Sequence, residues 1–211
     1  PRTSLVCLEN TVNKGGGVCY DYSSMLEISD FCKKNKLILH LDGARIFNAL
    51  VAKSHSSRDY GKLFDSISVC LSKGLGAPIG SVLIGDSKFI KEAKRVRKSF
   101  GGGMRQVGYL AAAGKYALEN HVDRLVEDHN RAQLIADTLK KLNYIENLRP
   151  VETNIVLFDV KDSHINNFKK SLDMKNIQVS FMGERTVRFV TNLGFCDNHL
   201  DTLLTTLLSL S

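Results

Sequence analysis

Short apolar runs alternate with longer segments of helical period along the first half of the chain. The runs predict strands at residues 4–8, 37–41, 66–71 and 81–84. Between and after them, three-and-four spacing of apolar positions predicts helices at 22–34 and 44–53, and a basic helix after the fourth strand. Buried strands that alternate with helices indicate an α/β architecture with a largely parallel sheet, covered on both faces.

From residue 104 onward the pattern changes. Helices are expected at 104–119 and 122–142, and Pro150 then breaks the pattern. Beyond it we expect a strand at 154–160, a helix at 163–175, strands near 178–181 and 187–190, and a leucine-rich amphipathic helix through Leu208. These elements predict a large α/β domain over residues 1–122, followed by a small α+β domain over 123–211.

The composition is that of an ordinary globular protein, with 43% hydrophobic and 24% charged residues. No stretch approaches the roughly 18 consecutive apolar residues of a membrane span. The net charge of +7 raises the question of nucleic acid. The densest basic segment, residues 88–98, is spaced like an amphipathic helix and has no accompanying series of aromatic residues, which favours a solvated or anion-facing helix. We therefore expect neither a nucleic-acid nor a membrane partner.

The five cysteines are scattered without C-x-x-C spacing, so we interpret them as free thiols in a reducing, cytoplasmic compartment. The six histidines lack the spacing of metal ligands, and we expect no metal site. The chain has no initiator Met and enters an apolar run almost at once, which we interpret as the mark of a fragment.

Ligands of parallel sheets collect at the carboxyl ends of the strands, which directs attention to the residues that follow each strand. Lys73 follows a buried strand and precedes small residues that would let a planar ligand approach the backbone. An uncharged lysine amine there could form a Schiff base. The alternative is a lysine that snorkels from the strand end, and the motif S-K-G by itself favours that alternative.

Asp42 follows a second strand, so it should face the same crevice as Lys73. A carboxylate could pair with the protonated ring nitrogen of pyridoxal phosphate (PLP). Arg45 could contact the phenolic oxygen of that cofactor or hold Asp42 in place. The alternative for Asp42 is the N-cap of a helix that begins near Ala44, and by itself it is at least as good an explanation.

Several strings of the sequence resemble those of the low-specificity L-threonine aldolases, which are fold-type I PLP enzymes of the β-eliminating lyase group. The longest are H-L-D-G-A-R-I-F-N-A at 40–49, C-L-S-K-G-L-G-A-P-I-G-S at 70–81 and G-G-G-M-R-Q-x-G-x-L-A-A-A-G at 101–114. The strings L-E-N-T at 8–11 and V-R-F-V-T-N at 187–192 follow the same order. The resemblance covers essentially the whole chain and implies that residues 1–122 are the C-terminal part of a PLP-binding large domain.

The resemblance implies a role for each matching residue. Lys73 matches the Schiff-base lysine, Asp42 the partner of the pyridine nitrogen, and Arg45 its neighbour at the cofactor ring. Arg188 matches the arginine that binds the substrate carboxylate, although without the family it would be interpreted as a charged residue on a strand of the small domain.

Two further basic residues, Lys98 and Arg105, match residues that this family contributes to the active site across a subunit interface. The resemblance therefore implies a homo-oligomer, a dimer or a tetramer. The Gly101–Gly103 turn would set a helix start at Arg105, and helix N-termini attract anions.

The chain also departs from the family. Val12 stands where the family often has histidine after L-E-N-T. The family's N-terminal portion, with the Ser-Gly-Thr-like loop that cups the cofactor phosphate, has no counterpart in the sequence. We therefore expect this chain to bind PLP weakly.

The activity expected for the parent enzyme is cleavage of L-threonine or L-allo-threonine to glycine and acetaldehyde. Lys73 would hold the cofactor, Arg188 would fix the amino-acid carboxylate, and the base that takes the hydroxyl proton is not identified by the sequence. Two alternatives remain open: another fold-type I lyase or aminotransferase, and a truncated fragment without catalytic activity.

Overall fold

The computed structural model describes residues 1–210 and divides the chain into two compact units. The first unit comprises Pro1–Thr11 and Cys19–Asp123, and the second comprises Val12–Val18 and the chain from Arg124 onward. The short loop Val12–Val18 therefore leaves the first unit and packs with the second, which the sequence did not predict. Assignment of the two units to a cofactor-binding domain and a small domain stays a prediction.

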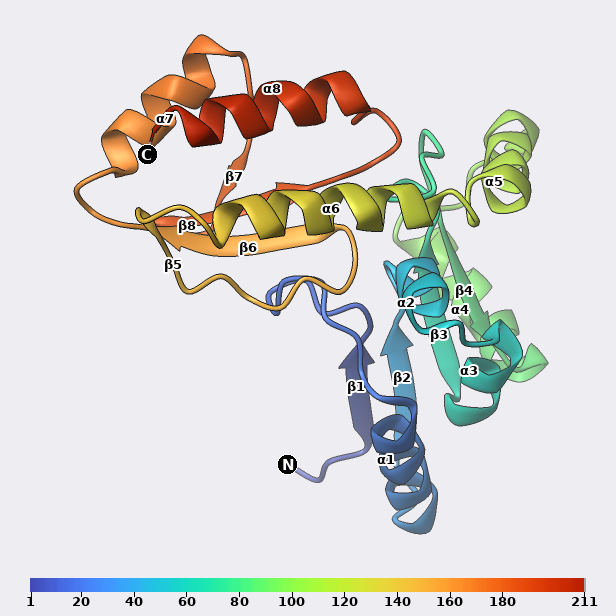
Figure 1. Cartoon of the computed structure of the whole chain (residues 1–211). Helices are drawn as coiled ribbons and strands as arrows, with labels where there is room; N and C mark the ends of the chain where they lie inside the picture. Colours follow the sequence, from blue (N-terminus) through green and yellow to red (C-terminus); the bar gives the residue numbers. More distant parts are fainter. Residues whose placement is uncertain (211) are drawn as a thin grey trace. The chain divides into compact units, whose positions relative to one another are not determined.

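A sheet in the order β1-β2-β3-β4 forms the centre of the first unit (Figure 1). Its strands are β1 (Leu5–Glu9), β2 (Ile38–Asp42), β3 (Ser66–Cys70) and β4 (Ser81–Gly85). The first three are parallel, as predicted, whereas β4 runs antiparallel to β3. The segment 71–80 between β3 and β4 is too short for the crossover of about a dozen residues that a parallel neighbour requires. The predicted α/β class with a mainly parallel sheet is confirmed.

The helices of the first unit are α1 (Tyr22–Lys34), α2 (Ile46–Lys53), α3 (Ser57–Leu63), α4 (Ser87–Ser99) and α5 (Gly108–Asn120). α1 has the predicted bounds, because Met25, Ser29 and Cys32 form one buried stripe at helical spacing. α3 was not predicted, since it is a single short segment in which only Tyr60 and Leu63 are buried.

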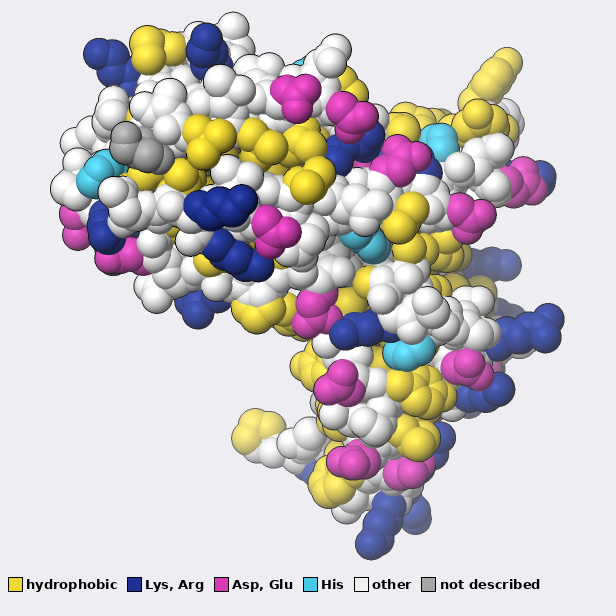
Figure 2. All heavy atoms as spheres, in the orientation of Figure 1, with side chains coloured by type: hydrophobic (Ala, Val, Ile, Leu, Met, Phe, Trp, Pro, Cys, Tyr) yellow, Lys and Arg dark blue, Asp and Glu magenta, His cyan; other side chains and the backbone are white. Residues whose placement is uncertain are grey.

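The core of the first unit lies under β2 and β3, where Met25, Leu39, Leu41 and Tyr60 are almost fully buried. The strand β4 is not fully covered by the rest of the described chain, because its first four residues are exposed. The basic helix α4 has no buried residue, and its Val96 side chain is 56% exposed. Hydrophobic side chains are also visible on the face of the molecule drawn in Figure 2.

The second unit is an antiparallel sheet in the order β5-β6-β8-β7, packed against helices. Its strands are β5 (Ile145–Glu146), β6 (Ile155–Val160), β7 (Ser180–Phe181) and β8 (Thr186–Val190), and its helices are α6 (Leu125–Leu139), α7 (Ile165–Met174) and α8 (Asp197–Leu208). Val156, Phe158 and Val160 of β6 belong to the helix-covered core. Side chains alternate along a strand, so Ile155 and Leu157 point to the opposite face.

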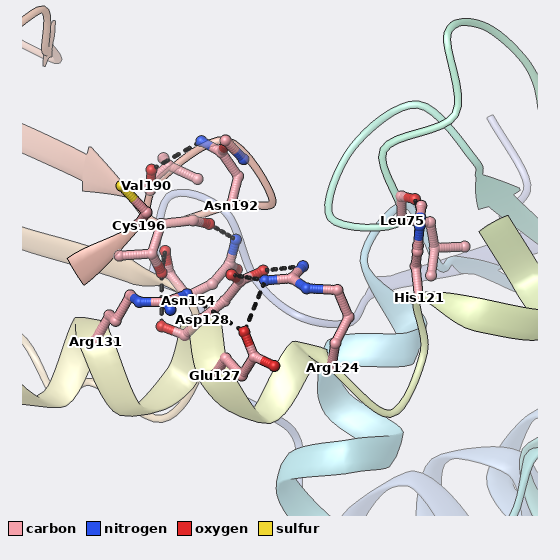
Figure 3. Close-up of polar contacts among 12 residues, drawn as sticks. Leu75, His121, Arg124, Glu127, Asp128, Arg131, Asn154, Val190, Asn192 and Cys196 are labelled. Atoms are coloured by element: carbon pink, nitrogen blue, oxygen red, sulfur yellow. Dashed lines mark hydrogen bonds and ion pairs between the residues drawn. The ribbon is translucent and has the colours of Figure 1, made fainter. Parts of the chain in front are cut away.

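Polar contacts fix the start of α6 to this sheet (Figure 3). Arg124 donates through Nη1 to Oδ2 of the fully buried Asp128 at 3.1 Å. The hydroxyl of Thr191 donates to the carbonyl of Asp128 at 2.7 Å, and the amide of Asn154 donates to the carbonyl of Thr191 at 2.8 Å. Because a buried polar group without a partner is costly, this chain of contacts sets where α6 lies on the sheet.

The loop Val12–Val18 covers the face of β6 that the helices leave open. The hydroxyl of Thr153 donates to the carbonyl of Gly17 at 2.6 Å. Gly17 has φ +80°, and a Cβ at this position would lie 2.6 Å from the Thr153 hydroxyl oxygen and 3.0 Å from Cβ of Ile155. Glycine is therefore required here both for its backbone conformation and for the close approach to the sheet.

Gly17→Ala should lower the free energy of unfolding by about 2 to 4 kcal/mol, through backbone strain and the steric overlap with Thr153. The measurement is urea denaturation followed by circular dichroism. Gly61→Ala is the matched control: Gly61 lies in α3 with nothing within 4 Å of the added Cβ. That control should be neutral or should stabilise by up to about 1 kcal/mol. Equal effects of the two substitutions would show that Gly17 is not constrained in this way.

Candidate active site

Asp42 and Lys73 lie at one edge of the sheet of the first unit. Asp42 is the last residue of β2, and Lys73 follows β3 beyond Leu71 and Ser72. β2 and β3 are parallel neighbours in which Asp42 pairs with Ser68, so their carboxyl ends meet at the same edge. Both side chains are exposed. The structure thus places the two strand-end residues that the sequence singled out at the same edge of the sheet.

The carboxylate of Asp42 is held by its own backbone turn. Its Oδ1 accepts a hydrogen bond from the backbone N–H of Ala44 at 3.0 Å. The predicted helix start at Ala44 is wrong, because α2 begins at Ile46 and its N-cap is Arg45, which makes no side-chain capping bond. Asp42 is therefore not a helix cap, and its carboxylate stays at the strand end.

A close approach between two strands fixes the backbone beside Asp42. The N–H of Gly43 donates to the carbonyl of Ser68 at 2.8 Å, and a Cβ on Gly43 would lie 2.8 Å from the same oxygen. Any larger residue would push the end of β2 away from β3. Glycine here keeps Asp42 at a constant position relative to β3.

Asn10 supports the same edge and was missed as a functional residue. Its backbone N–H donates to the carbonyl of Asp42 at 3.0 Å. Its buried side chain donates to the hydroxyl of Tyr60 at 3.2 Å and accepts from the N–H of Tyr20 at 3.4 Å. Burial raises the pKa of Tyr60 to about 12, so the phenol stays neutral. The only signal for Asn10 in the sequence was its place in the string L-E-N-T.

Lys73 sits in a turn closed by backbone hydrogen bonds. Gly76 N–H donates to the carbonyl of Lys73 at 2.9 Å, Ala77 N–H to Leu71 at 3.0 Å, and Leu71 N–H to Gly80 at 2.9 Å. Leu75, between these bonds, is only 3% exposed. The turn is thus compact and anchored by the buried side chains of Leu75 and Ala77, whereas the lysine is exposed.

The other basic residues of the first unit lie in different surroundings. Arg45 is half-buried at the N-cap of α2, in the same strand-to-helix connection as Asp42. Lys98 is exposed in the last turn of α4, and Arg105 is exposed before α5. The predicted helix start at Arg105 is wrong: α5 begins at Gly108, because Gln106 adopts φ +48° and interrupts the helical backbone. No helix begins at Arg105, so the predicted attraction of an anion by a helix N-terminus has no support at this residue.

Arg188 belongs to the second unit, on β8. Its Nη1 donates to Oδ1 of Asn13 at 2.9 Å, and its Nη2 donates to the hydroxyl of Ser180 at 3.3 Å. Its Nε is buried and has no hydrogen-bond partner within the described chain. Arg188 and Ser180 line a cavity of about 320 Å³ together with Thr191 and Phe195. A held guanidinium whose Nε–H has no partner can bind a carboxylate.

Residues 1–210 contain neither a candidate metal site nor a candidate membrane-spanning helix. No group of three or more His, Cys, Asp or Glu side chains in this range could hold a metal ion. Over the same residues, none of the helices has both the length and the apolar character needed to cross a membrane. The strand-end edge itself offers an amine, Lys73, a carboxylate, Asp42, and in the following connection the guanidinium of Arg45.

Comparison of the sequence gives a family and named relatives. Residues 1–163 match the model of the family described as beta-eliminating lyase. The chain is 45% identical over 163 residues to low-specificity L-threonine aldolase 1 of Arabidopsis thaliana, covering 77% of this chain and 46% of that protein. It is 41% identical over 192 residues to the low specificity L-threonine aldolase of Escherichia coli K12, covering 91% and 56%. The chain thus spans about half of the length of these relatives.

Solved structures with a similar fold include a protein of the kind found by sequence comparison. The threonine aldolase of Leishmania major superposes with a TM-score of 0.81 at 21% identity, over 98% of this chain and 61% of that one. CalE6, a methionine gamma lyase of Micromonospora echinospora, superposes with a TM-score of 0.72 at 13% identity, over 98% and 65%. At these identities the likeness shows the fold alone. Since the family model covers residues 1–163, this chain belongs to the beta-eliminating lyase family.

Proposed function

We propose that this chain carries the lysine and the carboxylate of a PLP-dependent enzyme that cleaves L-threonine or L-allo-threonine to glycine and acetaldehyde. The observation that carries the proposal is the position of Asp42 and Lys73 at the carboxyl ends of the neighbouring parallel strands β2 and β3. Family membership and relatives named low-specificity L-threonine aldolase support the reaction class.

The residues at the strand-end edge fit PLP in part. The cofactor requires an amine for its aldehyde and an acid beside its ring nitrogen, and Lys73 and Asp42 offer these groups on exposed side chains. Arg45, in the connection that follows Asp42, would contact the ring oxygen. The sequence offers no Gly-Ser/Thr cradle for the phosphate, so this chain alone should bind the cofactor weakly.

When bound, PLP supplies an electron sink for the bond that breaks at the substrate Cα. The contribution of Asp42 is a negative charge that keeps a proton on the ring nitrogen. Because Ala44 N–H holds one of its oxygens, the carboxylate needs no reorientation to do so. Lys73 is well suited to hold the aldehyde because its turn is fixed by backbone hydrogen bonds rather than by the lysine itself.

Arg188 would bind the carboxylate of the amino-acid substrate. Asn13 and Ser180 hold its two terminal nitrogens, which leaves Nε as a buried donor without a partner in the described chain. A carboxylate would satisfy that donor and neutralise the guanidinium. Fixing the carboxylate orients the substrate, which is how the Cα–Cβ bond becomes the one that breaks.

Lys98 and Arg105 would serve the active site of a partner subunit in a cytoplasmic homo-oligomer, a dimer or a tetramer. Support comes from their exposure and from their match to the family strings. Two alternatives to this function are another fold-type I enzyme and a fragment without activity. Another fold-type I lyase or aminotransferase is less well supported, because the relatives at 41% and 45% identity are named aldolases. A fragment without catalytic activity would release no aldehyde from threonine when this chain is assayed by itself.

In a protein of the relatives' length that contains this chain, Lys73→Ala should lower aldehyde release from threonine by about a thousandfold or more, because the amine that holds the cofactor is lost. Release is followed by coupled reduction of acetaldehyde, with glycine quantified separately. Lys62→Ala is the control, since Lys62 is exposed on α3 and pairs only at the surface with Asp59. Retention of full activity by Lys73→Ala would contradict the proposal, and a keto acid with ammonia in place of glycine would indicate the alternative enzymes.

Arg188→Ala should raise KM for threonine by about tenfold to a hundredfold, the value of a charge-assisted pair to a carboxylate. Arg188→Lys should restore only part of the affinity, because an ammonium cannot reproduce the guanidinium fork. Arg185→Ala is the matched control: Arg185 lies immediately before β8 and pairs with Glu146 and Asp162 at the surface. It should leave KM unchanged. An Arg188→Ala enzyme with the original KM would remove Arg188 from substrate binding.

A further inference from the structure

We propose that His121 is a positioning residue for Lys73, acting through the carbonyl of Leu75. It would hold the Lys73 loop, defined as residues 71–80, against the end of α5. The structural part of this inference stands on the geometry of the first unit. Its consequence for chemistry rests on the proposed function of Lys73.

The contact is a short hydrogen bond between groups far apart in sequence. Nδ1 of His121 lies 2.6 Å from the carbonyl oxygen of Leu75, across 46 residues (Figure 3). A carbonyl can only accept, so Nδ1 carries the proton and donates. Leu75 is almost fully buried, and a buried carbonyl that loses its donor costs about 1 to 3 kcal/mol. The loop therefore depends on this imidazole for one of its polar contacts.

The imidazole is itself fixed on α5. His121 is the C-cap of the helix, and its backbone N–H donates to the carbonyl of Ala117 at 2.9 Å. Its ring meets the ring of Tyr116 edge to face at 5.4 Å. A capped backbone and an aromatic neighbour together limit the orientations of the ring. The donor that reaches Leu75 is thus rigid.

A second contact between α5 and the Lys73 loop is independent of the histidine. Gly114 is buried on α5, and a Cβ at this position would lie 2.9 Å from Cδ1 of Leu71. The helix thus meets the loop at Leu71 before the lysine and at Leu75 after it. Two fixed points that flank Lys73 define the path of the backbone that carries its amine.

The backbone bonds inside the loop do not replace these contacts. They connect Lys73 to Gly76, Leu71 to Ala77 and Leu71 to Gly80, all within the loop itself. Such bonds preserve the shape of the turn but do not fix it to another element. Loss of the His121 contact should let the turn move as a body, and an error of about 1 Å in a reacting group can cost about a hundredfold in rate.

The test compares two variants of a protein of the relatives' length that contains this chain. His121→Leu removes the donor and keeps an apolar side chain, whereas His121→Asn keeps an N–H donor close to the position of Nδ1. Amide hydrogen exchange, read peptide by peptide, measures protection of the Lys73 loop and of α1 in the same sample. A second readout is the yield of PLP fixed by borohydride at Lys73, relative to Lys62 as an exposed reference lysine.

We expect His121→Leu to speed exchange in the Lys73 loop by about tenfold, the factor that corresponds to roughly 1.4 kcal/mol. Exchange in α1 should stay as it was, the labelling of Lys73 relative to Lys62 should fall severalfold, and His121→Asn should restore both. Unchanged loop protection in His121→Leu would overturn the inference. So would equal loss in α1, which would indicate a general structural role, or failure of the Asn variant to restore the loop.

The same experiment separates this inference from the proposed function. If Lys73 is not labelled in preference to Lys62 in the unsubstituted protein of the relatives' length, the proposed function fails. The exchange data then still decide whether His121 holds the loop. If Lys73 is labelled preferentially but His121→Leu changes neither readout, the positioning role is wrong and the proposed function stands.

Discussion

The parallel pairing of β2 with β3 is the constraint on which the candidate site depends. Register between Asp42 and Ser68 sets the end of β2 beside the middle of β3, and the Lys73 loop begins where β3 stops. An antiparallel pairing would send the two strand ends to opposite edges of the sheet. The acid and the amine thus lie at the same edge of the sheet because of the topology, before any contact between side chains is considered.

Support for this edge comes mostly through backbone atoms. Asn10 donates to the carbonyl of Asp42, Gly43 donates to the carbonyl of Ser68, and His121 reaches the carbonyl of Leu75. Each supporting residue thereby fixes the path of the chain and leaves the functional side chain exposed. This arrangement combines a rigid frame with an amine and a carboxylate that remain available to a ligand.

Much of this frame could be predicted from the sequence, where signals are local. The bounds of α1 follow from one buried stripe, and the places of Asp42 and Lys73 follow from apolar runs that end just before them. Features set by distant residues could not be predicted. The direction of β4 depends on pairing with β3, and the path of Val12–Val18 depends on packing of Gly17 against Thr153.

The same difference between local signals and contacts with distant residues applies to the candidate site residues. Hydrophobic periodicity alone did not predict a binding role for Arg188, because its partners Asn13 and Ser180 come from other parts of the chain. His121 had no signal, since its acceptor is a backbone carbonyl 46 residues away. Arg105 was assigned to a helix that begins only at Gly108, because a positive φ at Gln106 leaves no trace in hydrophobic spacing.

The claim that Asp42 and Lys73 bind the same cofactor molecule can be tested by measuring the protonation of the cofactor's ring nitrogen. PLP labelled with nitrogen-15 in its ring would be bound to a protein of the relatives' length that contains this chain, and its nitrogen resonance recorded. We expect the shift of a protonated ring nitrogen, changed to that of an unprotonated one by Asp42→Asn while Lys73 still holds the cofactor. An identical resonance in the two proteins would contradict it.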